Sequence, residues 1–303
     1  MTRHLLSMAD LDGAEVREIL ALSSRPELPQ SLTGKGAALL FEHPSARTRN
    51  ASEMAVVQLG GHPVTIRGEE VGFDVRESVE DIALVLARFY AVIGARVAKH
   101  RTLERMVAAL GAEHSPVPVV NLLSDREHPT QALADLLTIE QCLGELPGRV
   151  VAYIGDANNV CRSLAFALAR VGATLKVASP AGYAPEPEDL TTTAALGGEL
   201  VVCDSPEQAA RDADVLYTDV WVSMGEEAEA AAKRRAFSGY TISEALLSLA
   251  SPEAIVLHCL PAHRGEEIAA EVIDGPRSRV FLQAENRMHS IRGLLAFLTG
   301  TGR

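Results

Sequence analysis

The sequence predicts an α/β fold made of two doubly wound domains, each with a parallel sheet and helices on both faces. Short apolar runs alternate with helix-like stretches along almost the whole chain, a pattern typical of parallel sheets covered by helices. The alternation occurs as two successive series, the second starting at Arg149. The length of 303 residues is long for one hydrophobic core and sufficient for two.

The first series starts with a helix-like segment at residues 9–23. The runs expected to be strands are short, apolar and bounded by turn residues: 36–41, 62–66, 91–95 and 117–121. The stretches between and after them are expected to be helices: 47–59, 77–89, 100–110 and 130–143. Gly60 and Gly61 supply a stop for the first of these helices.

The second series follows a break near residues 143–148. Its predicted strands are again short and apolar: 150–154, 174–178, 199–203, 215–218, 254–258 and 280–282. Helices are expected at 160–171 and 288–298, and the Ala- and Glu-rich segment 226–235 is expected to be a helix or a mobile loop. We therefore predict one domain over residues 1–143 and a second over 149–287, with the C-terminal helix, 288–303, packing back on the first.

Composition indicates a globular protein and argues against two classes of partner. Apolar residues make up 47% and charged residues 22%, and 28 basic against 40 acidic residues give a formal charge of −12. Nucleic-acid binding relies on clustered basic charge, so no nucleic-acid partner is expected. No run approaches the roughly 20 apolar residues that span a bilayer, so no membrane partner is expected either.

The N-terminus and the cysteines favour a cytoplasmic protein. The first residues soon turn acidic and have no long apolar core, so we expect no secretory signal. The four cysteines are scattered, without a C-x-x-C pair: Cys142, Cys161, Cys203 and Cys259. They are expected to be free thiols rather than disulfides or a zinc site.

Polar and charged side chains follow the predicted strands in both halves, where ligands bind in open parallel sheets. In the first half these are the segment 45–49, Arg96, Asn121, Ser124, Asp125, His128 and Gln131. In the second half they are the segments 156–159, 219–225, 258–261 and 285–287. We expect an active site in a cleft between the two domains, lined by these residues.

The first-half residues suit an anion. Ser45, Thr48 and the backbone N–H groups at a helix start attract negative charge, and Arg47 and Arg96 can each make paired hydrogen bonds to phosphate or carboxylate. Taken alone, Arg47 and Arg49 are also consistent with surface helix residues, and His128 with a helix cap. The turn after Gly155 lacks the glycines of a dinucleotide or P-loop site, so no nicotinamide or ATP cofactor is expected.

Four motifs in this order resemble the aspartate/ornithine carbamoyltransferase family. They are Ser-x-Arg-Thr-Arg from Ser45, His-Pro-x-Gln from His128, Asp-x-x-x-Ser-Met-Gly from Asp219 and His-Cys-Leu-Pro from His258. The last two are similar to the ornithine branch of the family. The resemblance covers residues 36–298.

The resemblance implies carbamoyl transfer from carbamoyl phosphate to the side-chain amine of L-ornithine, giving L-citrulline and phosphate without cofactor or metal. Its implied catalytic residues are Arg47, His128, Cys259 and Arg287. Carbamoyl phosphate would contact Ser45, Ala46, Arg47, Thr48, Arg96, His128, Gln131, Cys259, Leu260 and Arg287. Ornithine would contact Asn159, Asp219, Ser223 and Met224. The family also implies a homotrimer or an assembly of trimers.

Two of these roles remain open from the residues themselves. Cys259 can orient or deprotonate the incoming amine, whose free pKa is about 10.4, or it can be a buried thiol at a strand end. Trp221, the only tryptophan, lies in the predicted acceptor segment and can serve packing alone.

The sequence departs from the family pattern at three positions. Ala46 stands where a threonine is usual, so one hydroxyl is lost, a change of about 0.5–1.5 kcal/mol. Asn50 stands where the family usually has an aromatic residue. Glu70 aligns with a glutamine that reaches the carbamoyl phosphate of a neighbouring subunit, in a loop about two residues longer than usual. A carboxylate there would repel phosphate unless it is protonated, turned away, or paired with Arg67 or Arg76.

These departures leave three hypotheses. The chain is an ornithine carbamoyltransferase, a carbamoyltransferase for a different amine, or a non-catalytic relative that binds an anion or amino acid. Retention of Arg47, Arg96, His128, Gln131, Cys259 and Arg287 together disfavours the third hypothesis, and Ser-Met-Gly favours the first over the second.

Overall fold

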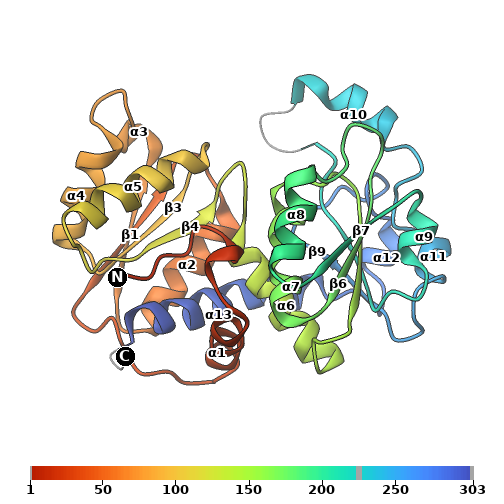
Figure 1. The fold of residues 1–303 in the computed structure, drawn as a ribbon, viewed down its shortest axis with the longest axis horizontal. Coiled ribbons are helices and arrows are strands. Elements are labelled where there is room, and N and C mark those ends of the chain that lie inside the picture. The colour runs from red at the N-terminus through yellow and green to blue at the C-terminus, as the bar shows by residue number, and fades with distance from the viewer. Residues whose placement is uncertain (1, 223–226, 301–303) are drawn as a thin grey trace. The chain divides into compact units, whose positions relative to one another are not determined.

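The structure is a computed structural model that describes residues 2–222 and 227–300 (Figure 1). The chain forms two compact units. Unit 1 comprises Met1–Ala134 and Glu285–Arg303, and unit 2 comprises Asp135–Ala284. The chain passes between the units inside two helices, α6 (Pro129–Leu143) and α13 (Val280–Thr299). The predicted domains, residues 1–143 and 149–287, were defined by the ligands they bind and not by contacts within the chain. Their boundaries therefore stay a prediction.

The sheet of unit 1 is parallel throughout and has the strand order β2-β1-β3-β4. Its strands are β1 (Gly36–Phe41), β2 (His62–Arg67), β3 (Val92–Arg96) and β4 (Val119–Leu123). Five of the six residues of β1 are buried, because helices cover both faces of a central strand. The chain winds outward from β1 in both directions, so the sheet is doubly wound.

Helices cover both faces of this sheet (Figure 1). They are η1 (Met8–Asp10), α1 (Gly13–Ser23), α2 (Ala46–Gln58), α3 (Gly68–Val71), α4 (Val79–Phe89) and α5 (His100–Ala112), with parts of α6 and α13. One core cluster joins Ala38 and Leu40 of β1 to Ile82 of α4 and Leu103 of α5. The alternate residue Leu39 faces the opposite side, where Gly94 leaves room for it.

The sheet of unit 2 is also parallel and has the order β7-β6-β5-β8-β9. Its strands are β5 (Val150–Ile154), β6 (Thr174–Ala178), β7 (Glu199–Cys203), β8 (Val215–Thr218) and β9 (Ile255–His258). The helices of this unit are α7 (Asn159–Val171), α8 (Pro187–Ala195), α9 (Pro206–Ala210), η2 (Glu227–Glu229), α10 (Ala230–Ala236), α11 (Glu244–Leu247) and α12 (Ala270–Ile273). Helices α7 and α8 cover one face, and α9, α11 and α12 the other (Figure 1).

The fold class predicted from the sequence is confirmed, since both sheets are parallel and covered by helices. One predicted strand, residues 280–282, is wrong. These residues form the first turn of α13, which begins at Val280. Burial there has a helical spacing, because Val280, Gln283 and Arg287 are buried whereas Phe281 is 72% exposed.

Candidate active site

In both units the predicted site residues lie at the carboxyl ends of adjacent strands. In unit 1 they follow β1, β3 and β4, and in unit 2 they follow β5, β8 and β9. The strand order reverses between β1 and β3 and between β5 and β8. Ligands bind at such switch points in open α/β sheets. Each unit therefore presents one candidate ligand cluster.

The unit 1 cluster begins at the N-terminus of α2. Ser45 is the N-cap, and its Oγ accepts from the Thr48 N–H at 3.4 Å and donates to Thr48 Oγ1 at 3.1 Å. The N–H groups of the first helical turn have no partner within the helix, and the 13-residue helix adds its dipole. This end of α2 is thus suited to an anion.

Arg287 of α13 joins this helix end to His128. Its Nη2 donates to Thr48 Oγ1 at 2.5 Å and lies 3.4 Å from His128 Nε2. Arg287 and His128 are buried, with 4% exposure each. An arginine is always a donor, so His128 Nε2 faces it as an acceptor, and the ring is the tautomer protonated at Nδ1.

Burial and neighbouring charge make His128 a poor base. The pKa of His128 lies well below its ordinary value, first because the ring is buried and then because Arg287, Arg96 and Arg47 are near. Gln131, one turn along α6, is also buried, and its N–H donates to the His128 carbonyl at 3.0 Å. A neutral His128 can hydrogen-bond a substrate oxygen or amide, but it lacks the second, acidic proton of an imidazolium and so is not a general acid at neutral pH.

Arg96, the last residue of β3, is a buried cation beside other cations. It is 7% exposed, and within residues 2–222 and 227–300 its Nε has no hydrogen-bond acceptor. Burial, then Arg287 and Arg47, lowers the pKa of Arg96 to about 10. A buried charge without a counter-charge is unfavourable. The cluster of Arg47, Arg96 and Arg287 therefore fits an anionic ligand.

The unit 2 cluster centres on Asp219, which follows β8. Asp219 Oδ1 accepts from the Cys259 thiol at 2.9 Å and from the Val220 N–H at 2.8 Å. Asp219 Oδ2 accepts from Asn158 Nδ2 at 2.9 Å. Asp219 and Cys259 are 7% and 9% exposed. The structure thus brings together two predicted residues, a carboxylate that suits an ammonium group and a thiol.

The sequence analysis named Asn158 only as part of the segment 156–159, and the structure gives this residue two tasks. Its Oδ1 caps α7 by accepting from the Val160 N–H at 2.9 Å, while its Nδ2 holds Asp219. The predicted Asn159 is the first residue of α7. The N-cap preference for asparagine was readable from the sequence, but the contact with Asp219 joins positions far apart in the chain and was not.

Leu260, predicted from the motif, has a constrained backbone. Its φ is +58°, an uncommon value for a residue with a side chain. Its N–H donates to His258 Nδ1 at 2.9 Å, and His258 Nε2 contacts Glu267 Oε1 at 3.1 Å. His258 and Glu267 are fully enclosed. Sequence analysis named His258 only as part of a motif and gave no signal for Glu267.

A glutamine on α13 holds the end of β9 in place. Gln283 Oε1 accepts from the His258 N–H at 2.8 Å. Its Nε2 donates to Asp135 Oδ1 at 2.7 Å and to the Tyr217 hydroxyl at 3.1 Å. Asp219, His258 and Cys259 bring possible metal-ligand atoms within 4.8 Å of one another. Both ring nitrogens of His258 and the thiol are engaged in the hydrogen bonds above, so these residues form a hydrogen-bonded network.

Two predicted acceptor residues, Ser223 and Met224, lie outside the described residues. Trp221, just before them, is 6% exposed and stacks on Phe237 with ring centroids 5.6 Å apart. Packing is therefore one role of Trp221. Ala46, the departure in the first motif, is the first residue of α2, and its carbonyl accepts from Asn50 Nδ2 at 2.7 Å.

The loop that carries Glu70 is held within its own unit. Glu70 is exposed on α3 and borders a cavity of about 160 Å³ with Ile66 and Val71. Arg105 bonds the loop residue Asp74 at 2.6 and 2.9 Å and Glu80 of α4 at 2.6 Å. Neither the arginines nor His128 of the unit 1 cluster border this cavity.

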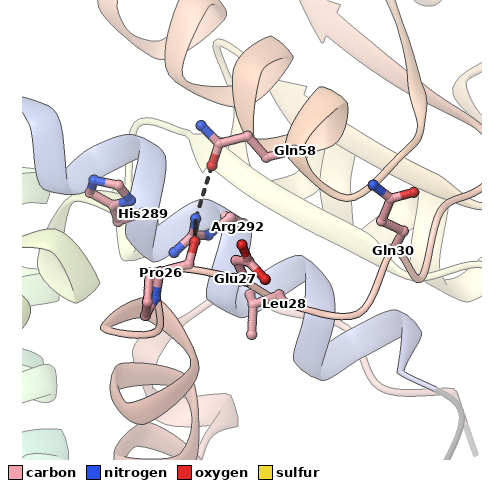
Figure 2. Close-up of a pocket in the computed structure, with 7 residues that line it drawn as sticks. All are labelled: Pro26, Glu27, Leu28, Gln30, Gln58, His289 and Arg292. Carbon is pink, nitrogen blue, oxygen red and sulfur yellow. Dashed lines mark hydrogen bonds between the residues drawn. The ribbon is translucent and has the colours of Figure 1, made fainter.

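A larger cavity, of about 580 Å³, lies elsewhere in unit 1 (Figure 2). Its lining residues are Pro26, Glu27, Leu28, Gln30, Gln58, His289 and Arg292. No predicted site residue is among them. Arg292 donates to Gln58 Oε1 at 3.0 Å and to the Pro26 and Ser23 carbonyls at 3.3 and 3.2 Å. It therefore caps the C-terminal end of α1 and is not a free anion-binding group.

Two family models together match almost the whole chain. Residues 3–141 match the model described as aspartate/ornithine carbamoyltransferase, carbamoyl-P binding domain. Residues 147–298 match the model described as aspartate/ornithine carbamoyltransferase, Asp/Orn binding domain. Among the described residues, no helix has both the length and the apolar character needed to cross a membrane.

Relatives and solved structures agree with these models. A protein named ornithine carbamoyltransferase from Acidothermus cellulolyticus is 48% identical, with 98% of this chain and 97% of that protein covered. One with the same name from Thermus thermophilus is 46% identical over the same shares.

The ornithine carbamoyltransferase structure from Pyrococcus furiosus superposes with a TM-score of 0.91 at 39% identity, covering 99% of this chain and 98% of that chain. The corresponding crystal structure from Thermus thermophilus gives a TM-score of 0.88 at 42% identity, covering 98% and 99%. The resemblance stated from the four motifs is thereby confirmed: this chain belongs to the aspartate/ornithine carbamoyltransferase family.

Proposed function

We propose that this protein transfers the carbamoyl group of carbamoyl phosphate to the side-chain amine of L-ornithine, giving L-citrulline and phosphate. The observation that carries the proposal is the cation cluster in which the exposed Arg47 lies near the buried Arg96 and Arg287, and in which the Arg96 Nε has no acceptor in the described part of the chain. Carbamoyl phosphate is a dianion, and its negative charge would balance these cations. Full-length relatives named ornithine carbamoyltransferase support ornithine as the acceptor over another amine.

The unit 1 cluster would stabilise the leaving group. As the neutral amine nitrogen bonds to the carbamoyl carbon, the bond from that carbon to the phosphate oxygen breaks and phosphate leaves with its electron pair. The amine nitrogen loses one proton, which the departing phosphate would take up. Ser45, Thr48 and Arg287 are donors already held in place by their mutual contacts, so they would stabilise the charge on the departing phosphate without rearranging. His128 and Gln131 would bind the carbamoyl group itself.

The unit 2 cluster would receive the acceptor. Asp219 is a buried carboxylate and would hold an ammonium group of the amino acid. Cys259 donates its thiol proton to Asp219, so its sulfur is available to accept from the attacking amine and orient it. Asn159, Leu260, Ser223 and Met224 remain predicted ligand contacts.

We further propose that the protein works in the cytoplasm as a homotrimer or an assembly of trimers. All four cysteines are free thiols, which supports a reducing compartment. Met54 and Val57, one turn apart on α2, are 46% and 48% exposed and would be covered in an assembly. Light scattering should give about three times the chain mass of 32.3 kDa, or a multiple of that value.

The test is a citrulline-formation assay with carbamoyl phosphate and ornithine, run beside putrescine, lysine, 2,3-diaminopropionate and aspartate. Selective turnover of ornithine is expected. Selective turnover of another amine would replace the acceptor, and no turnover with any amine would leave an anion-binding relative. Arg47→Ala should abolish most turnover. Arg49→Ala is the matched control, because Arg49 is equally exposed but pairs with Glu53 at 2.8 Å.

A further inference from the structure

A buried lysine outside the predicted site ties α10 to unit 2. Lys233 is 3% exposed, although lysine is almost never fully buried unless paired. Its Nζ lies 2.8 Å from Asp156 Oδ2, and the Asp156 side chain is 15% exposed. Neither residue has a role in the proposed chemistry. A buried pair of this kind is weak evidence for stability, so another role has to be considered.

Asp156 opens the turn after β5 that carries Asn158. The Asp156 carbonyl accepts from the Asn158 N–H at 2.7 Å, and the Ala157 N–H donates to the Tyr183 carbonyl at 3.0 Å. Lys233 Nζ also lies 5.4 Å from the centre of the Tyr183 ring. Lys233 therefore contacts the turn at Asp156 and also contacts Tyr183, whose carbonyl accepts from Ala157 of the turn. The turn in turn places Asn158 Nδ2 against Asp219 Oδ2.

The other end of α10 packs against the segment that follows Asp219. Phe237 is the C-cap of α10 and is fully buried. Its ring stacks on Trp221 at 5.6 Å and 24°, and lies 4.8 Å from Tyr183. Trp221 is two residues beyond Asp219. Helix α10 thus contacts the segments after both β5 and β8, which carry the acceptor residues.

We propose that the Lys233–Asp156 pair positions the acceptor amino acid, by setting the turn through which Asn158 orients Asp219. This inference rests on the proposed function. Lys233 would touch neither substrate and is a positioning residue. Its loss should therefore weaken the acceptor site of unit 2 and leave the carbamoyl phosphate cluster of unit 1 unchanged.

The experiment measures both Michaelis constants for Lys233→Met in the full-length protein. The KM for the acceptor should rise at least tenfold, while the KM for carbamoyl phosphate should change less than twofold. Lys233→Arg keeps the charge and should recover much of the acceptor affinity. Arg234→Met is the matched control, because Arg234 is the next residue on α10 and pairs with Glu266 at 3.1 Å on the surface; both constants should stay unchanged.

A second variant separates positioning from folding. Lys233→Met alone removes the 2.8 Å ion pair of Asp156, a carboxylate that is only 15% exposed, and this loss can destabilise the protein. The double variant Lys233→Met/Asp156→Asn removes both charges of this ion pair and should keep a Tm close to that of the wild type. On the proposal, its acceptor KM remains raised. An acceptor KM restored to the wild-type value would show that the pair acts only through stability, and the inference would be wrong.

Trp221 offers a readout that does not need turnover. It is the only tryptophan, and its stacking on Phe237 makes its fluorescence sensitive to changes around Asp219. L-Norvaline lacks the side-chain amine of ornithine. Its titration should reach half-saturation at a concentration at least tenfold higher in the double variant than in the wild type. Equal curves would overturn the inference.

The wild-type assay separates this inference from the proposed function. Wild-type inactivity with ornithine would count against the proposed function, and the norvaline titration would still decide the role of Lys233. Suppose instead that the wild type is active and that the acceptor KM is unchanged in Lys233→Met and in the double variant. The proposed function would then stand, and the positioning role would be refuted.

Discussion

Arg96 shows how a single residue can favour binding at the expense of folding. A pKa lowered to about 10 by burial and by Arg287 and Arg47 corresponds to roughly 3 kcal/mol against the charged form. An anion reverses this balance, because it supplies the missing counter-charge. We infer that the ligand-free protein carries this energetic strain and that carbamoyl phosphate relieves it.

Arg96→Met should therefore stabilise the ligand-free protein and weaken carbamoyl phosphate binding. Without ligand, we expect the unfolding free energy to rise by about 1–3 kcal/mol, with a correspondingly higher Tm. We also expect at least a hundredfold rise in the KM for carbamoyl phosphate. Thermal unfolding and initial rates measure the two effects. Arg49→Met serves as control and should change neither. A lower Tm for Arg96→Met without ligand would contradict this account of the cluster.

His128 should make stability depend on pH. Its pKa is lowered by burial and by the three arginines, so below about pH 6.5 the unfolded chain binds a proton that the folded chain does not. The contribution of His128 to the free energy of unfolding is therefore complete above that pH. It falls as the pH drops further, by up to about 1.4 kcal/mol per pH unit for one such group. Burial also lowers the pKa of His4 and of His100, which adds in the same direction.

Urea unfolding between pH 5 and 7.5 tests this dependence. His128→Gln should reduce the slope by about one proton, because glutamine does not titrate. An unchanged slope in His128→Gln would mean that His128 is protonated in the folded protein.

At the scale of elements, the sequence predicts most of the strands and the site-bearing strand ends. The strands of unit 1 were found within two residues of their observed bounds, because buried parallel strands are short apolar runs between turns. The same rule failed at residues 280–282, since a short apolar run looks alike in a strand and in the first turn of a buried helix. Contacts such as Asn158 with Asp219 depend on tertiary placement, which local patterns do not contain.

Arg292 gives α13 a structural role at the end of α1. Its guanidinium donates to the carbonyls of Ser23, Arg25 and Pro26 and to Gln58 Oε1. Hydrogen bonds from charged donors contribute about 1.5–3 kcal/mol each when they are lost singly, and burial, which lowers the pKa of Arg292, offsets part of the sum.

Arg292→Met should lower the unfolding free energy by about 2–4 kcal/mol and leave both Michaelis constants close to wild type. Chemical denaturation and steady-state rates are the measurements. Arg17→Met, at an exposed position of α1, should cost less than about 0.5 kcal/mol. A change in the carbamoyl phosphate KM equal to that of Arg96→Met would indicate that the cavity of Figure 2 takes part in binding.

At the scale of the molecule, each unit should respond mainly to its own ligand. When carbamoyl phosphate is added, backbone amide hydrogen exchange should slow first in the segments that form the unit 1 cluster: 41–49, 95–98, 124–132 and 285–290. Added L-norvaline should then slow exchange in the segments of the unit 2 cluster: 154–161, 218–222 and 257–262. Slowing by carbamoyl phosphate confined to unit 2 would reverse the assignment of the two clusters.

The points where the two contact units divide carry no marker in the sequence, and they do not test the ligand-binding domains predicted over residues 1–143 and 149–287. The two sheets follow from two series of strands. The divisions at Ala134/Asp135 and Ala284/Glu285 fall inside α6 and α13, where no change in composition, glycine or proline marks them. Only the packing of each helical half against its own sheet sets these points, and helical periodicity continues through both.

The buried charge of Arg96 also affects how long the protein lasts in a cell. A ligand that binds only the folded state adds about 2.7 kcal/mol of stability at a hundred times its dissociation constant. Proteases act on the opened fraction of a protein. Chains without carbamoyl phosphate should therefore be degraded sooner than occupied ones, so the amount of this protein would follow the supply of carbamoyl phosphate without any change in its synthesis.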